Sequence, residues 1–241
     1  MKNWYVETFG EIYPVIYGHR TVEAAAPEAR FAADVLELSP RDRVLDLGCG
    51  GGRHMAHLNG RVSLIAGLDY SSALLDEARR LMPQCDVVRA DMRAMPFAGA
   101  FDAVVNFFTS FGYFTDEENA GVAGQIAAAL RPGGRFFVDY FLAGHARANL
   151  QAESIRRING LTIEETRWID EVNQRLKKTT KVYEEGALSG EYHESVRLYE
   201  PEDFQRLFET QGLAVRHFYG DYDGAPLAPG KPRMIAVGSK R

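Results

Sequence analysis

Short apolar runs alternate with amphipathic segments through the middle of the chain. The apolar runs are rich in β-branched residues, which is typical of buried strands, and the segments between them carry apolar residues at helical spacing. This pattern predicts strands at residues 44–47, 62–68, 87–89, 103–106 and 135–139, and helices at residues 53–58, 72–82 and 117–130. Alternation of strand and helix favours an α/β fold, in which helices cover both faces of a parallel sheet.

The two ends of the chain follow other patterns. Aromatic residues recur through the first helical stretch, and a second helix is predicted over residues 23–38. After residue 150, polar and apolar positions alternate, which predicts antiparallel strands at residues 161–169, 174–184 and 191–199. A helix at 201–210 and strands at 214–219 and 234–237 complete the chain. We therefore predict four segments: a helical lid (1–40), a core (41–150), an antiparallel strand insertion (151–200), and a helix with strands that return to the core sheet (201–241).

The strongest local signal is the sequence VLDLGCGGGRH, residues 44–54. A predicted strand carries Asp46 near its end, and glycines then occupy positions 48, 50, 51 and 52 before a helix. Glycine permits positive φ and lets a ligand approach the backbone, and the N–H groups at the start of a helix attract anions. Nicotinamide dehydrogenases use a similar turn, but their G-x-G-x-x-G pattern needs a small residue where this chain has Arg53.

The chain resembles the class I S-adenosylmethionine-dependent methyltransferases between Val44 and Tyr140. The glycine turn, GLDYS, ADMR, FDAVVNFFTSFGYF and LRPGGRFFVDYF follow one another in the order of that family's motifs. The resemblance implies a Rossmann-like, seven-stranded, mostly parallel sheet with helices on both faces, and S-adenosylmethionine as the cofactor of the core. The aromatic N-terminal segment also resembles a bacterial and archaeal subgroup that includes small-molecule and sugar-nucleotide N-methyltransferases.

The resemblance also implies where the cofactor binds. The glycine turn matches the motif around its methionine end, and Asp69 matches the acid that binds both ribose hydroxyls, for which a carboxylate offers two acceptors. Asp91 and Met92 match the adenine contacts. The expected cofactor-binding residues are Asp46, Gly48, Cys49, Gly50, Asp69, Tyr70, Asp91, Met92, Asn106 and Phe107.

The acceptor side is predicted from position in the chain. Asp139 and Tyr140 end the fifth strand, so we expect them to face the cleft, and Tyr17 lies in the lid; these three are the expected catalytic residues. Contacts to the acceptor are expected from Tyr13, Arg20, Thr109, Phe111 and Tyr113. Methyl transfer is an in-line displacement, so alignment is the main requirement, and whether a base is needed depends on whether N or O is methylated.

Several of these residues have simpler interpretations. The aromatic residues could all be core, Asp69 could cap a helix, and Cys49 could be inert between its glycines. His54 and His57 lie three residues apart but no third ligand accompanies them, so no metal is expected. His193 could be a base above the site or a solvated strand residue.

Composition narrows the function further. The 241 residues carry 28 Lys and Arg against 33 Asp and Glu, a net charge of −5, which disfavours a nucleic-acid substrate. Asn106 is not followed by the prolines of DNA-amino methyltransferases. The two cysteines, the lack of a long apolar run and the polar N-terminus favour a cytoplasmic protein without a membrane segment.

The favoured interpretation is therefore an enzyme, a monomer or homodimer, that methylates N or O of a small molecule. Two alternatives stay open. One is a methyltransferase acting on protein or RNA. The other is a protein that binds S-adenosylmethionine without catalysis, because binding and chemistry are separable.

Overall fold

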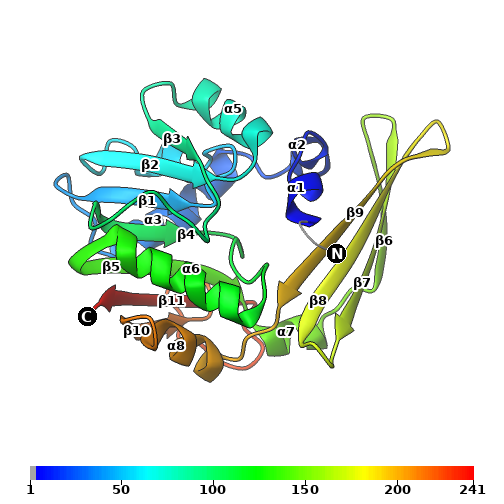
Figure 1. Cartoon of the computed structure of the whole chain (residues 1–241). Coiled ribbons are helices and arrows are strands. Elements are labelled where there is room, and N and C mark those ends of the chain that lie inside the picture. Colours follow the sequence, from blue (N-terminus) through cyan, green and yellow to red (C-terminus); the bar gives the residue numbers. More distant parts are fainter. Residues whose placement is uncertain (1–3) are drawn as a thin grey trace.

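A seven-stranded sheet forms the centre of the computed structural model, which describes residues 4–241 (Figure 1). Its strands lie in the order β3-β2-β1-β4-β5-β11-β10. The first five in sequence pair in parallel, whereas β11 pairs antiparallel with both β5 and β10. The bounds are β1 Arg43–Leu47, β2 Leu64–Asp69, β3 Asp86–Arg89, β4 Phe101–Asn106, β5 Leu130–Phe141, β10 Leu213–Tyr219 and β11 Arg233–Lys240. The predicted seven-stranded, mostly parallel sheet is confirmed.

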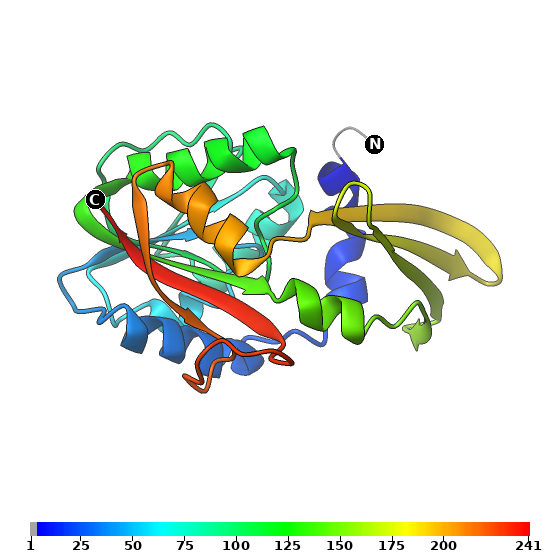
Figure 2. The same cartoon turned by 90° about the horizontal axis from the view of Figure 1, so that it is seen from below.

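Helices cover both faces of this sheet (Figure 2). One face packs against α3 (Ala26–Val35), α4 (Met55–Leu58) and α5 (Ser72–Leu81), and the other against α6 (Asp116–Ala129) and α8 (Pro201–Glu209). Neighbouring strand residues divide between two apolar clusters: Val104 and Phe136 face α6 and α8, while Val105 and Phe137 face α3. This alternation follows from the two-residue period of a strand and explains why the strands are apolar on both faces.

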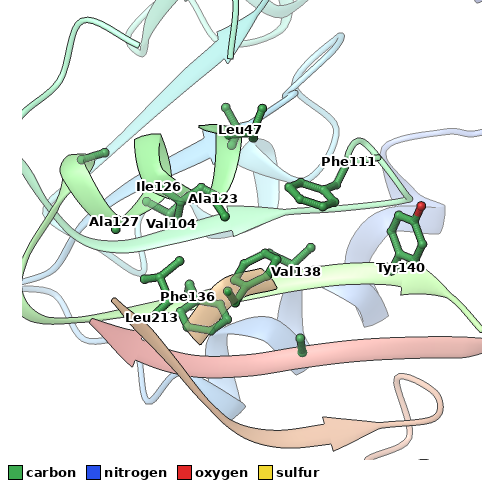
Figure 3. Close-up of a cluster of buried hydrophobic side chains, with 14 of the residues drawn as sticks. Leu47, Val104, Phe111, Ala123, Ile126, Ala127, Phe136, Val138, Tyr140 and Leu213 are labelled. Atoms are coloured by element: carbon green, nitrogen blue, oxygen red, sulfur yellow. The ribbon is translucent and has the colours of Figure 1, made fainter. Parts of the chain in front are cut away.

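The cluster beneath α6 is built mainly from large side chains (Figure 3). Phe136 and Val138 of β5 lie under Ile126 of α6, and all three are fully buried. The helix begins at a capping box, in which Glu118 N donates to Thr115 Oγ1 and Thr115 N donates to Glu118 Oε2. This face of the sheet is therefore closely packed, and α6 is capped where it begins.

A separate four-stranded antiparallel sheet follows β5 and the short helix α7 (Ala143–Ala148). It comprises β6 Glu153–Ile158, β7 Leu161–Asp170, β8 Arg175–Glu184 and β9 Ala187–Arg197. The sequence predicted three of these strands and missed β6, which is short and strongly charged. The start predicted for the last strand, residue 191, is wrong, because the chain reverses at Glu185 and Gly186, both at positive φ, and β9 already begins at Ala187.

The N-terminal helices lie between the two sheets (Figure 1). They are α1 Trp4–Thr8 and α2 Ile12–Tyr17, followed by the 3₁₀ turn η1 Glu23–Ala25. Thr8 Oγ1 donates to the carbonyl of His193 in β9 at 2.7 Å, and Ile16 packs on Ile163 and Val182 of the second sheet. Within residues 4–241, no helix has the length and apolar character needed to cross a bilayer.

Candidate active site

A cavity of about 430 Å³ opens where β1, β2 and β4 end. One wall is the glycine turn after β1 with the ends of β2 and β3, and the opposite wall is the N-terminal segment around α2. The predicted site residues that line it are Tyr13, Tyr17, Arg20, Gly48, Cys49, Gly50, Asp69, Tyr70, Asp91, Met92, Phe107 and Tyr113. The cavity therefore joins the two groups of residues that the sequence assigned to cofactor and acceptor.

The glycine turn needs its glycines for two different reasons. Gly48 has φ of 74°, and a Cβ there would lie 2.8 Å from Cβ of Ser110, so any side chain would collide. Gly50 has φ of 52°, and a Cβ there would make only an ordinary contact, 3.8 Å from Cδ1 of Leu74, so the backbone conformation alone favours glycine. Backbone N–H groups of Gly48 and Cys49 both donate to the carbonyl of Leu68 and fix the turn on β2. The helix that follows is a single turn, α4, shorter than the predicted 53–58, so it adds little helix-dipole field.

Asp69 ends β2 and lies against this turn. Its Oδ2 accepts from Gly50 N and its Oδ1 accepts from Ser71 N, each at 2.9 Å. Ser71, not Asp69, caps α5, since Ser71 Oγ accepts from Leu74 N. Burial raises the pKa of Asp69, and the backbone hydrogen bonds oppose that rise. Asp69 is thus held by the backbone on the cavity wall, one strand away from the glycines.

Asp91 and Met92 follow β3 on the same wall. Arg93 forms an ion pair with Asp91 at 2.7 Å and also donates to Glu118. Burial works against ionisation of Asp91, but the hydrogen bonds from Arg93 outweigh it and lower the pKa of this carboxyl. The carboxylate is therefore ionised and fixed in orientation beside the cavity.

Two acceptor atoms lie buried beneath the glycine turn without a donor among residues 4–241: Asp46 Oδ2 and Asn106 Oδ1. They come from the neighbouring strands β1 and β4. The amide of Asn106 cannot turn to relieve this, because its Nδ2 donates to Leu47 O at 2.6 Å. Burial is the main cause that raises the pKa of Asp46 to about 7. Asp46 and Asn106 do not line the cavity, so the cofactor contacts predicted for them remain a prediction.

The acceptor wall is aromatic. The rings of Tyr13 and Tyr17 are 4.5 Å apart, and the guanidinium of Arg20 lies 4.2 Å from the ring centre of Tyr17. Tyr17 Oη donates to Glu194 Oε1 at 3.2 Å and accepts from Lys178 Nζ. Burial is the first cause that raises the pKa of Tyr17. Two residues of the second sheet thus hold the hydroxyl of Tyr17 in the cavity wall.

The expectation that Asp139 and Tyr140 face the cleft is wrong. Both side chains are fully buried and neither lines the cavity. Asp139 accepts from Phe108 N at 2.7 Å and forms an ion pair with Arg233 at 2.5 Å. Tyr140 lies in the apolar cluster near Phe111 and donates to the carbonyl of Arg197 (Figure 3). The position of a residue at the end of a strand predicts that it lies at the edge of the sheet, but not where its side chain points. Here the side chains of Asp139 and Tyr140 both point into the interior.

Two of the predicted acceptor contacts also lie outside the cavity. Phe111 is 1% exposed and packs on Tyr140, Phe204 and Phe208, which makes it a core residue. Thr109 accepts from Arg233 Nη2 behind the cavity wall. Its φ is 62° and that of Phe108 is 57°, which is strained for both residues. Asp139 and Arg233 therefore hold a strained loop whose Phe108 side chain faces the cavity.

The remaining reactive residues have structural partners. His54 Nε2 donates to Glu28 at 2.5 Å while its ring stacks on Phe107 at 3.9 Å, and His57 Nε2 donates to Val22 O at 2.7 Å. Burial raises the pKa of the Cys49 thiol well above its usual value, so it is not a thiolate. Across residues 4–241, no three His, Cys, Asp or Glu side chains form a group that could hold a metal ion.

Some cavity residues are not among the site residues that the sequence assigned. Phe9, Arg53, His54, Glu77, Phe108 and Ser110 all line the cavity. Phe108 and Ser110 stand beside predicted residues directly after β4, so their position in the chain was a usable signal. Glu77 carries no such signal, because only the packing of α5 brings it near the glycine turn.

Comparison with known proteins agrees with this geometry. A family model described as a methyltransferase domain matches residues 44–134. Over 231 residues, the chain is 29% identical to a dTDP-3-amino-3,4,6-trideoxy-alpha-D-glucopyranose N,N-dimethyltransferase of Streptomyces venezuelae, which covers 92% of this chain and 97% of the relative. A dTDP-3-amino-3,6-dideoxy-alpha-D-glucopyranose N,N-dimethyltransferase of Streptomyces fradiae is 26% identical over 95% of this chain and 92% of its own.

Among solved structures, that of DesVI from Streptomyces venezuelae superposes with a TM-score of 0.69 and 27% identity, covering 96% of this chain and 98% of DesVI. The similarity therefore extends beyond the main sheet to the second sheet. The fold, the cofactor class and the enzyme class predicted from the sequence are confirmed. The chain is therefore an S-adenosylmethionine-dependent methyltransferase, similar over nearly its whole length to N,N-dimethyltransferases of amino sugars.

Proposed function

We propose that this enzyme methylates the amino nitrogen of a small acceptor of the amino-sugar kind. The observation that carries the proposal is that the glycine turn and Asp69 line the same cavity as Tyr13, Tyr17 and Tyr113. Two relatives that align over nearly the whole chain are named as N,N-dimethyltransferases of amino sugars. These alignments cover 92% and 95% of this chain, far more than the cofactor-binding core, which supports a related acceptor for this chain.

The residues of the cofactor wall fit S-adenosylmethionine. Asp69 offers a carboxylate to the ribose hydroxyls at the end of β2, and Asp91 with Met92 stands where an adenine would lie. The absence of a Cβ at Gly50 lets the ligand approach the backbone of the turn. Beneath the turn, the unsatisfied oxygens of Asp46 and Asn106 suit the α-ammonium group at the methionine end, which would supply the missing donors.

The bound cofactor supplies an electrophilic methyl group on a sulfonium. Residues of the chain then have to exclude water and align the acceptor nitrogen with the carbon–sulfur bond. The aromatic side chains of Tyr13, Tyr113 and Phe108 give this wall a low polarity. Holding two reactants in line can lower the barrier by about 7–11 kcal/mol, so alignment alone accounts for a large part of catalysis.

Tyr17 is the residue we propose to contact the acceptor amine. Its oxygen donates to Glu194 and accepts from Lys178, which leaves one lone pair for an N–H group of the acceptor. An ammonium acceptor must lose a proton before it can attack. The hydrogen bond from Tyr17 to Glu194 offers that proton a path toward the second cavity, which Glu194 lines.

The proposal is tested by incubating the enzyme with isotopically labelled S-adenosylmethionine and a panel of amino sugars, free and nucleotide-linked. Each is paired with the sugar that carries a hydroxyl in place of the amine. We expect label on nitrogen in at least one amino sugar and none on its hydroxyl partner, as detected by mass spectrometry. Label on the hydroxyl sugars, or cofactor binding without transfer to any acceptor, would contradict it.

A further inference from the structure

The loop after β4 passes from the core of the main sheet to the cavity wall. Phe111 is enclosed in the core, whereas Tyr113 lines the main cavity and also a second cavity of about 510 Å³. The chain turns between them at Gly112, whose φ is 83° and where a Cβ would collide with the hydroxyl of Tyr140. The ring of Tyr113 packs edge-on against Trp4, with 5.2 Å between the ring centres. The position of this loop therefore sets a part of the wall that both cavities share.

Arg175, at the start of β8, contacts three consecutive carbonyl groups of this loop. Its guanidinium donates to the carbonyl of Phe114 at 2.9 Å, to that of Tyr113 at 3.0 Å and to that of Gly112 at 3.2 Å. It also donates to the hydroxyl and the carbonyl of Ser195 in β9, at 2.7 and 2.8 Å. One side chain thus joins two strands of the second sheet to the cavity wall.

No carboxylate competes for this guanidinium. Nearby arginines are paired with acids: Arg197 with Asp116 and Arg147 with Glu200, each at 2.8 Å. Arg175 forms no ion pair within 4 Å among residues 4–241. Its planar fork of donors is bound instead by backbone and hydroxyl oxygens on two sides. A lysine, with three donors on a single nitrogen, could not span the same set of acceptors.

The loop is held at its end by α6. Asn119, which is fully buried, donates to the carbonyl of Phe114 at 3.1 Å and accepts from the N–H of Phe114 at 3.2 Å. The carbonyl of Tyr113 has no such contact from the main sheet, and its only donor among residues 4–241 is Arg175. Arg175 is therefore the contact that fixes the middle of the loop, directly at the residue that faces the cavity.

We propose that Arg175 is a positioning residue for methyl transfer, which fixes the side chain of Tyr113 in the cavity wall from the second sheet. Tyr113 belongs to the wall that we assign to the acceptor, so this inference rests on the proposed function. Methyl transfer depends on alignment, and a displacement of about 1 Å caused far from the reacting atoms can cost about 100-fold in rate. The second sheet thus acts on the reaction through the wall.

The first test separates the rate from cofactor binding. Arg175→Lys keeps the charge but loses the planar fork, so we expect kcat to fall about tenfold or more with the amino sugar found in the panel. The Kd of S-adenosylhomocysteine, measured by calorimetry, should change by less than about threefold. Arg157→Lys, at an exposed position of β6 in the same sheet, is the matched control. Unchanged kcat, or equal losses of kcat and of S-adenosylhomocysteine affinity, would overturn the inference.

Chemical rescue distinguishes positioning from a loss of stability. Arg175 lines the second cavity, so a small guanidinium compound can reach the space that Arg175→Ala leaves. Methylguanidinium should restore kcat of this variant in a saturable manner and leave the wild type and Arg157→Ala unchanged. If Arg175→Ala kept the melting temperature of the wild type and methylguanidinium restored nothing, the inference would be wrong.

Hydrogen exchange provides a measurement that needs no acceptor. In ligand-free Arg175→Lys, the amide of Phe114 should exchange faster than in the wild type, while Val104 of β4 and Ile126 of α6 keep their rates, as followed by mass spectrometry of peptides. Equal rates at Phe114, or faster exchange at all three residues, would count against a local role of Arg175. If the wild type methylated no amino sugar of the panel, the proposed function would fail, and hydrogen exchange alone would decide whether Arg175 fixes the loop.

Discussion

At the scale of single residues, the carboxylates near the glycine turn differ because their partners differ. Asp69 accepts two backbone N–H groups, whereas the buried Oδ2 of Asp46 has no donor among residues 4–241. A buried carboxylate without a donor is costly when charged, which is why burial is the main cause that raises the pKa of Asp46 to about 7. The chain thus carries a buried carboxylate that is costly to ionise directly beneath its proposed binding site. This cost should make its stability depend on pH.

Asp46 should make stability depend on pH. Its pKa is about 7 in the folded chain and 3.8 in the unfolded reference. Between about pH 4 and pH 7 the folded state keeps a proton that the unfolded state has lost, so the free energy of unfolding falls as pH rises. Three pH units correspond to about 4 kcal/mol. Urea unfolding of the ligand-free enzyme across this window should show the decline. Asp46→Asn should make it shallower, with a remaining slope from Asp69, whose pKa burial also raises.

Asp76→Asn is the control for that measurement, because Asp76 is exposed on α5 and its ion pair with Arg79 is on the surface. It should follow the wild-type curve. If Asp46→Asn declined with the same slope as the wild type, the ionisation assigned to Asp46 would be wrong.

Asp69 should decide cofactor affinity. In Asp69→Asn the neutral amide replaces the carboxylate that we propose to accept from the ribose hydroxyls. Loss of hydrogen bonds to a charged group is worth about 1.5–3 kcal/mol, or about 10–100-fold in Kd for S-adenosylhomocysteine. Calorimetric titration checks this, with Asp76→Asn as the control. If Asp69→Asn bound S-adenosylhomocysteine as tightly as the wild type, Asp69 would not be a cofactor-binding residue.

At the scale of the elements, β5 ends near the cavity but contributes no side chain to its lining. The strand continues past Asp139 to Phe141, and its partner β11 runs beside it through that end. Side chains there pack into both faces of the sheet instead of opening to the cavity. Tyr140 is enclosed with Phe111 and Phe204, and its hydroxyl would collide with any Cβ at Gly112.

Tyr140→Phe should therefore reduce stability without changing catalysis. The variant loses a buried hydrogen bond from Tyr140 Oη to the carbonyl of Arg197, which is worth about 1–2 kcal/mol. We expect a lower urea midpoint, with kcat and acceptor KM within about twofold of the wild type. A large fall in kcat at unchanged stability would show that Tyr140 takes part in catalysis after all.

The order of the elements could be predicted from sequence because it depends on local patterns. Apolar runs and helical spacing gave the strands of the main sheet, and the glycines with Asp69 located the cofactor wall. The wrong predictions of which side chains line the cavity have a common cause, which is packing between residues far apart in the sequence. Nothing local shows that Arg233, 94 positions after Asp139, would occupy that carboxylate, or that Asn106 would turn inward to Leu47 O. The support of Tyr17 by Lys178 and Glu194 crosses even longer separations.

The hydrogen bonds from Tyr17 to Glu194 and from Lys178 to Tyr17 mean that the second sheet holds a residue of α2 that we propose to contact the acceptor. Tyr17→Phe keeps the ring but removes the oxygen that we propose to contact the acceptor. We expect kcat/KM for the acceptor to fall about tenfold, the value of one hydrogen bond, while S-adenosylhomocysteine affinity is unchanged. Tyr183→Phe, at the far end of β8, should change neither quantity. Equal loss of cofactor and acceptor binding in Tyr17→Phe would mean that the phenol only shapes the wall.

At the scale of the whole molecule, the cavity is closed by parts of the chain that are far apart in sequence. Tyr13 and Arg20 come from the N-terminal segment, the glycine turn from β1, and Phe108 from the loop after β4. The N-terminal segment is itself fixed on the second sheet through Thr8 and Ile16. A ligand bound in this cavity therefore contacts both the main sheet and the helices that join it to the second sheet, so it should stabilise them together.

S-adenosylhomocysteine should accordingly raise the melting temperature of the whole chain in one transition. A ligand at 100 times its Kd adds about 2.7 kcal/mol to the free energy of unfolding, and for a chain of this size each kcal/mol is worth about 2–4 °C. We expect a rise of about 5–11 °C by calorimetry, a much smaller rise for Asp69→Asn at the same concentration, and none with NAD. Two transitions, of which the ligand moves only one, would show that the N-terminal helices and the second sheet do not close over the bound cofactor. The acceptor wall would then have to come from elsewhere.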